Sequence, residues 1–91
     1  MTTTQTTPRH FTKLVNRART IGIERTDPPR PIGEIGRVLG VSRQTIYNLL
    51  DGKHTPRPFI RERLARGLAK LLSMPLDEVR RHVESDWRET F

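Results

Sequence analysis

The sequence predicts an all-α fold, a compact bundle of about five helices. Apolar residues recur at helical spacing in five segments, and prolines or glycines separate each segment from the next. No segment alternates apolar and polar residues as strongly with the two-residue period of a strand. The 91 residues suit one small domain, and a chain without cysteine must gain its stability from helix packing instead of disulfides or cysteine-bound zinc.

The first helix is expected to follow a polar N-terminal arm. Residues 1–7 are rich in threonine and hold nothing to bury, so we expect them to be disordered. Thr7 and Pro8 have the pattern of an N-cap followed by a proline at the first helical position, and Gly22 is typical of a helix end. The predicted buried face of this helix holds Phe11, Leu14, Val15, Ala18 and Ile21.

Two short helices are predicted in the middle of the chain. The three prolines of residues 24–31 predict a loop. Helical spacing returns over residues 32–39, and Ser42 is then a good N-cap for another helix that runs to about Leu50. The predicted buried residues of this pair are Ile32, Ile35, Gly36, Leu39, Ile46, Leu49 and Leu50.

Two longer helices are predicted in the last third of the chain. A basic loop at residues 53–58 precedes a helix from about Ile60, and Pro75 opens the fifth helix. The predicted inward residues of the first are Ile60, Leu64, Leu68, Leu71 and Leu72. A single stripe of the second would carry Leu76, Val79, Val83, Trp87 and Phe91. The cations of the first lie among acids and are interpreted as a structural surface: Arg61, Arg63, Arg66 and Lys70.

The charge of the chain favours a polyanionic partner. The net charge is +7, and residues 1–60 carry +6 of it. The three histidines, His10, His54 and His82, are far apart in sequence, and no nucleophile motif or phosphate-binding loop is present. We therefore expect no enzyme, no metal and no cofactor, and no small-molecule ligand is evident. No apolar run is long enough for a membrane span or a secretion signal, which favours the cytoplasm.

The stretch GRVLGVSRQTIYNLLDG, residues 36–52, has the residue types that two closely crossing helices require. A tight turn between them needs a left-handed residue, here Gly40, and the close crossing needs a small residue, here Gly36. Ile46 and Leu49 supply the inner face of the second helix. The sequence thus predicts a rigid two-helix unit over residues 32–51.

This unit, together with the downstream stretch LARGLAKLLSMPLDEVRRHV, resembles the helix-turn-helix DNA-binding proteins of the phage repressor and Cro type. The resemblance covers residues 32–83. It implies a lambda-repressor-like domain over residues 8–85, followed by a C-terminal extension at residues 86–91. It also implies a transcriptional regulator, by family default a repressor, that occupies an operator in duplex DNA inside a bacterial cell.

The second helix of the unit would present the residues that read bases. Because Ile46 and Leu49 face inward, Arg43, Gln44, Tyr47 and Asn48 are expected on the exposed side. Arginine pairs with guanine, glutamine and asparagine pair with adenine, and a tyrosine ring packs on the thymine methyl group. The predicted contacts to the DNA backbone are Arg37, Ser42, Thr45, Lys53, His54, Thr55 and Arg57. Ser42 would serve as a cap, or as a cap and a phosphate contact at once.

Two basic or aromatic features leave alternatives open. The row Arg9, Lys13 and Arg17 is either a second backbone contact or a solvated helix face. Trp87 and Phe91 either form a two-fold dimer on a near-palindromic operator or fold back onto the domain's own core.

Other functions would fit parts of the same pattern. An excisionase-like architectural DNA binder shares the Ser-Arg-x-Thr helix entry, but would follow it with a strand wing. An antitoxin of the same fold would bind a toxin protein. RNA binding is the weakest alternative, because one Trp, one Tyr and three Phe provide no stacking platform.

Overall fold

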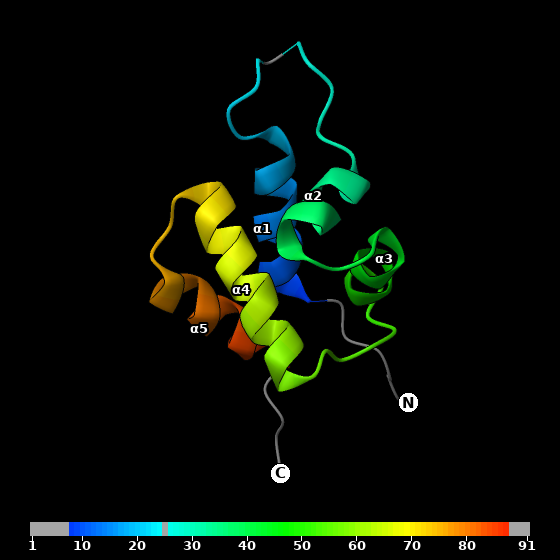
Figure 1. The fold of residues 1–91 in the computed structure, drawn as a ribbon, viewed down its shortest axis with the longest axis vertical. Helices are drawn as coiled ribbons and strands as arrows, with labels where there is room; N and C mark the ends of the chain where they lie inside the picture. Colours follow the sequence, from blue (N-terminus) through cyan, green and yellow to red (C-terminus); the bar gives the residue numbers. More distant parts are fainter. Residues whose placement is uncertain (1–7, 25, 88–91) are drawn as a thin grey trace.

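Five helices make up the part of the chain that the computed structural model describes, residues 8–24 and 26–87 (Figure 1). They are α1 (Arg9–Thr20), α2 (Ile32–Leu39), α3 (Arg43–Leu50), α4 (Pro58–Leu72) and α5 (Leu76–Trp87). These residues contain no strand, and the predicted all-α bundle is confirmed. None of these helices has the length and apolarity that a membrane span would need. The predicted polar arm at residues 1–7 lies outside the described residues.

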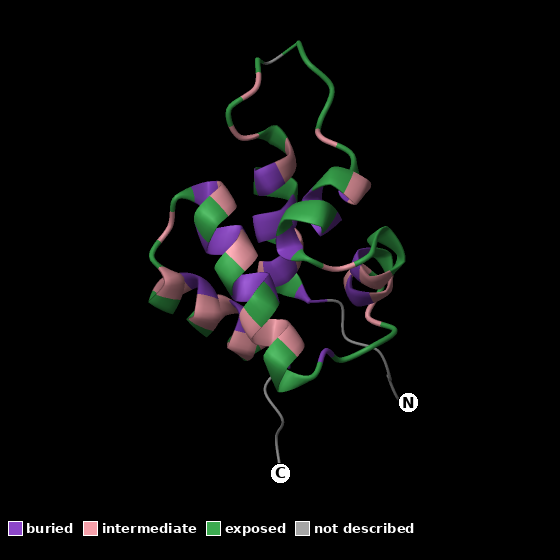
Figure 2. Ribbon diagram, in the orientation of Figure 1, coloured by how far each residue is buried: buried purple, intermediate pink, exposed green. Residues whose placement is uncertain are grey.

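The core lies where α4 meets α1, α2 and α5, and α3 joins it chiefly by packing on α2. All five helices contribute buried apolar side chains, and the buried segments converge on the middle of the bundle (Figure 2). The predicted stripes supply this core, while Ile21, Leu50, Ile60, Leu71 and Leu76 pack at its edge and are partly buried. The exposed face of α3 is consequently left at one side of the molecule.

The start of α1 differs from the prediction. The helix begins at Arg9, and Pro8 takes the N-cap position without capping the helix through its side chain. The cap comes from α5, where Asp86 accepts hydrogen bonds from the backbone N–H groups of His10 (3.1 Å) and Phe11 (2.6 Å). A carboxylate at this end also meets the positive pole of the helix dipole.

Removal of the Asp86 carboxylate is expected to lower the free energy of unfolding by about 1–2 kcal/mol, because two amide groups of α1 lose their acceptor. The comparison is between the native chain and Asp86→Ala in urea denaturation. Ser85→Ala, at an exposed position of the same helix, is the matched control and should change stability by less than about 0.5 kcal/mol. Equal stability of the two variants would show that the cap contributes nothing.

Trp87 folds back onto its own chain. Its side chain is only 7% exposed, and its ring packs against Phe11 with 5.2 Å between centroids. Of the two alternatives left open for Trp87, the structure shows the indole folded back onto the domain's own core, because α1 covers the end of α5. Phe91 lies outside the described residues.

A cluster of charged side chains fastens α4 to α5. Arg80 donates from Nε and Nη2 to the two carboxylate oxygens of Glu62, at 2.9 and 2.8 Å. Arg66 adds a third hydrogen bond of 2.9 Å. The hydrogen bonds from Arg80, helped by Arg66, lower the pKa of Glu62 to about 2 from an ordinary value of 4.5.

The lowered pKa of Glu62 predicts a loss of stability in acid. The folded state keeps this carboxylate ionised at pH values where the unfolded chain protonates it. Its contribution to the free energy of unfolding is therefore complete above pH 4.5 and is lost as the pH falls from 4.5 to about 2. Glu62→Gln should therefore show a shallower loss of stability over this range in urea denaturation. Glu78 has no ion pair among the described residues. Glu78→Gln should therefore lose stability with falling pH as steeply as the native chain does. Parallel curves for all three chains would contradict the assignment.

Candidate nucleic-acid interface

The α2–α3 crossing depends on two glycines. A Cβ atom at Gly36 would lie 2.7 Å from the carbonyl oxygen of Val41, so only glycine lets the turn approach α2 this closely. Gly40 has a φ of 78°, in the left-handed region that ends α2. The N–H of Val41 donates to the carbonyl of Gly36 at 2.9 Å. Both predicted roles are confirmed.

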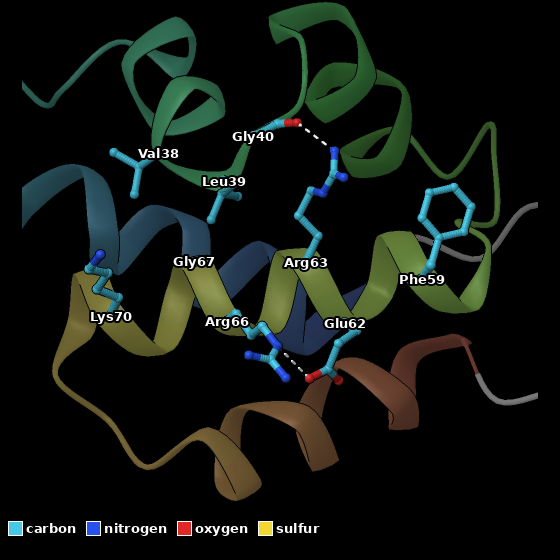
Figure 3. Close-up of a pocket in the computed structure, with 9 residues that line it drawn as sticks. All are labelled: Val38, Leu39, Gly40, Phe59, Glu62, Arg63, Arg66, Gly67 and Lys70. Atoms are coloured by element: carbon cyan, nitrogen blue, oxygen red, sulfur yellow. Dashed lines mark hydrogen bonds and ion pairs between the residues drawn. The ribbon is translucent and has the colours of Figure 1, made fainter.

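The turn is also anchored to α4. Arg63 donates from Nη1 to the carbonyl oxygen of Gly40 at 3.2 Å (Figure 3). A Cβ atom at Gly67 would clash with Leu39, so this second glycine lets the end of α2 lie directly against α4. These contacts fix the angle at which α3 leaves the bundle.

The first turn of α3 is capped by Ser42, as predicted. The Oγ atom of Ser42 accepts a hydrogen bond from the N–H of Thr45 at 3.1 Å, and the two hydroxyl groups lie 2.8 Å apart. Ile46 and Leu49 are buried against the core. The cap and the inner face thus orient the remaining side chains of this helix outward.

The outer face of α3 holds the predicted base-reading residues. Arg43, Gln44 and Tyr47 are exposed, and Asn48 is half-buried. Gln44 donates from its side-chain amide to Oδ1 of Asn48 at 3.2 Å. The two amides are therefore paired along the outer face of α3.

Two hollows flank this face of α3. The α2-side hollow, of about 550 Å³, is lined by Arg19, Pro31, Ile32, Gly33, Glu34, Arg37, Arg43 and Tyr47. The loop-side hollow, of about 700 Å³, lies between α3, the loop that follows it and the start of α4. Its lining is Gly40, Val41, Ser42, Thr45, Asn48, Leu49, His54, Thr55, Pro56, Arg57, Phe59, Ile60 and Arg63.

The hollows bring together residues that are scattered in the sequence. Six predicted contacts share the loop-side hollow, from Ser42 in the turn to Arg57 before α4. Arg37, Arg43 and Tyr47 share the α2-side hollow. Gln44 and Lys53 line neither hollow. Lys53 is exposed just beyond α3, where its backbone N–H donates to the carbonyl of Asn48 at 3.0 Å.

Both hollows are positively charged. Among the described residues that line the loop-side hollow there is no acid, and Arg57 and Arg63 supply the charge. The α2-side hollow contains three arginines and one acid, Glu34, which lies 3.4 Å from Nε of Arg30. Two phosphate backbones border the major groove of DNA, about 12 Å wide, so a helix with a cationic hollow on each side suits that shape.

Arg19 belongs to the site although its sequence position did not reveal it. Its Nε donates to the carbonyl of Arg30 at 2.6 Å, which directs the side chain toward the start of α2. The predicted basic row of α1, Arg9, Lys13 and Arg17, is exposed but lines neither hollow.

Two histidines meet where the start of α1 packs on α5. His10 and His82 stack with 5.0 Å between ring centroids, and Nδ1 of His10 lies 3.1 Å from Oδ1 of Asp86. Both carboxylate oxygens of Asp86 already accept hydrogen bonds from backbone N–H groups at the start of α1. Within residues 8–24 and 26–87, no group of three His, Cys, Asp or Glu side chains could hold a metal ion.

Comparison of the chain with family models, curated proteins and solved structures gives no match. The outward face of α3 presents hydrogen-bond donors and acceptors of the kinds that base edges pair with, bordered on both sides by cations that would attract an anionic backbone.

Proposed function

We propose that the chain is a sequence-specific regulator of transcription that binds double-stranded DNA through α3. The observation that carries this proposal is the exposed polar face of α3 between two positively charged hollows. The resemblance to the repressor and Cro type supports the same reading, with repression by occupation of an operator. The site of action would be the bacterial cytoplasm, including the host cytoplasm if a phage encodes the chain.

In this proposal the side chains of α3 enter the major groove. Arg43 donates two hydrogen bonds to O6 and N7 of guanine. The bond between Gln44 and Asn48 leaves the Gln44 oxygen and one of its N–H groups free, which matches N6 and N7 of adenine. Tyr47, 44% exposed, packs its ring on a thymine methyl group or reaches a phosphate with its hydroxyl.

The two hollows would receive the phosphate backbones. On the loop side, Arg57 and the hydroxyl groups of Thr55 and Ser42 contact one strand, and His54 joins them. On the other side, Arg37 and Arg19 contact the second strand. Lys53, exposed beside the loop, adds a charge contact.

Two copies of the chain would bind together. The eight residues of α3 rise roughly 12 Å, which covers only three or four base pairs and gives one copy little specificity. We therefore propose a homodimer on a near-palindromic operator, with two α3 helices about 34 Å apart. Its contact surface would lie outside the Trp87 indole, which the protein's own core covers.

The region after α3 distinguishes a repressor-type regulator from an excisionase-like architectural DNA binder. An excisionase-like binder would place a strand wing there, whereas α4 and α5 follow α3 and complete the core. This continuation favours a repressor-type regulator.

Titration onto a labelled mixed-sequence duplex at two salt concentrations tests the DNA-binding part of the proposal. Affinity should fall steeply with salt, because each phosphate contact releases counterions. Lys53→Ala should weaken binding to all sequences about equally and lower the slope of log K against log salt by about 1. Lys70→Ala, which removes an exposed lysine that lines neither hollow, is the charge-matched control. A chain that does not bind duplex DNA at low salt would contradict the proposal.

A further inference from the structure

A groove between α2 and α4 has features that the proposed DNA contacts do not use. Its walls are residues 38–40 at the end of α2 and one stripe of α4 from Phe59 to Lys70, and its volume is about 490 Å³ (Figure 3). We call it the α2–α4 groove. Its floor is the close contact of Leu39 with Gly67.

The α2–α4 groove collects exposed apolar side chains. Among the described residues, the large apolar side chains that stay exposed are Val38 (45%), Tyr47 (44%) and Phe59 (61%). Tyr47 belongs to the outer face of α3, whereas Val38 and Phe59 both line this groove. Val38 lies near the Lys70 end of the groove and Phe59 at the other end (Figure 3), so both ends offer apolar surface of the kind that interaction sites use.

The same groove carries cations without carboxylate partners. Arg63 donates one hydrogen bond to the carbonyl of Gly40 and forms no ion pair within residues 8–24 and 26–87. Lys70 likewise forms no ion pair within these residues. The acid of the groove, Glu62, is already bound by Arg66 and Arg80. The groove therefore offers positive charge beside apolar surface, and its own acid cannot neutralise it.

We propose that the α2–α4 groove binds an acidic amphipathic segment of another protein. Apolar side chains of that segment would pack on Val38 and Phe59, and its carboxylates would pair with Arg63 and Lys70. The stripe from Phe59 to Lys70 is roughly 16 Å long at about 1.5 Å per residue, which matches about three turns of a bound helix.

Charge and apolarity together select this occupant. A second copy in a two-fold contact through this groove would bring the cations of one copy, Arg63 and Lys70, toward those of the other, and like charges repel. A nucleic-acid backbone would satisfy the cations but leave Val38 and Phe59 in water. An acidic amphipathic segment satisfies both features at once.

The proposal does not depend on DNA binding, and the chain offers variants that separate the two sites. Gly40, Phe59 and Arg63 line both the groove and the loop-side hollow. Val38 and Lys70 line the groove and neither hollow beside α3. Substitutions at these last two residues therefore probe the groove alone.

The test is a selection of a random peptide library displayed on phage against the full chain, followed by fluorescence anisotropy with the enriched peptides. We expect enrichment of peptides that combine large apolar residues with Asp and Glu. Val38→Ser and Lys70→Glu should each weaken their binding by about tenfold or more, as expected for a buried anchor and a reversed charge. Arg81→Glu, at an exposed position of α5, is the control for general charge attraction and should leave binding nearly unchanged.

Several results would overturn the proposal. These are a selection without enrichment, peptides without acidic residues, or acidic peptides whose binding is equally sensitive to Arg81→Glu. If Lys70→Glu weakened duplex DNA binding while Val38→Ser changed neither ligand, the groove would be an extension of a nucleic-acid surface. Thermal melting of each variant checks that it is folded.

Discussion

Replacement of Gly36 by alanine is expected to destabilise the protein, whereas the same change at Gly33, in the same helix, is expected to stabilise it. At Gly36 the added methyl group would meet the Val41 carbonyl oxygen at 2.7 Å. Backbone on both sides of that contact cannot give way cheaply, so we expect a loss of about 2–3 kcal/mol. At Gly33 the new Cβ would meet only the Cδ atom of Arg43, at 3.8 Å, and the higher helix propensity of alanine should contribute up to about 1 kcal/mol.

Urea denaturation of the two variants measures this difference. Because both substitutions lie in α2 and add the same atoms, the unfolded-state effects cancel and the difference reports the crossing of α2 and α3. Gly36→Ala should also weaken duplex DNA binding of the folded protein, since a wider crossing of α2 and α3 would change the position of α3 relative to the cations on either side. Equal effects of the two substitutions on stability would contradict the close crossing.

Arg43→Ala is expected to reduce affinity for the preferred duplex about tenfold to a hundredfold. The estimate follows from the roughly 1–3 kcal/mol that a bidentate contact to guanine contributes to discrimination. The loss should be smaller on duplexes in which that base pair is changed, because those sequences lack the contact from the start. Stability should hardly change, since Arg43 is exposed.

Arg81→Ala is the matched control for Arg43→Ala. It removes the same charge from an exposed position of α5, on the far side of α4 from α3 (Figure 1). Its effect should be limited to a weak, sequence-independent loss from the lower net charge. If both arginine variants lost affinity equally on all sequences, Arg43 would contact phosphate and would not read a base.

Features of the fold that depend on residues close together in the chain could be predicted from the sequence. Helical spacing predicted all five helices, and local chemistry predicted the glycines of the crossing and the Ser42 cap, because each acts within a few residues of its partner. The predicted start of α1 was wrong by one residue, because the group that caps this helix is distant in sequence. Its cap, Asp86, is 75 residues away from Phe11, and no local pattern connects them.

The same distinction holds for the candidate site. Which side chains of α3 face outward follows from its period once Ile46 and Leu49 are placed inside. The two hollows could not be predicted, because they form between α3 and elements distant in sequence, with α1 and α2 on one side and the following loop and α4 on the other. Arg19 and the apolar pair Val38 and Phe59 became apparent only when distant helices were brought together.

Selection of random duplex DNA by the full chain, with sequencing of the bound pool, tests directly whether α3 reads bases. We expect a consensus of two inverted half-sites about one helical turn apart, each with a guanine for Arg43 and an adenine for Gln44. Repetition with Gln44→Ala should relax one position in each half-site and leave the others unchanged. Recovery of duplexes without any sequence preference, or of none at all, would contradict the proposal that α3 reads bases.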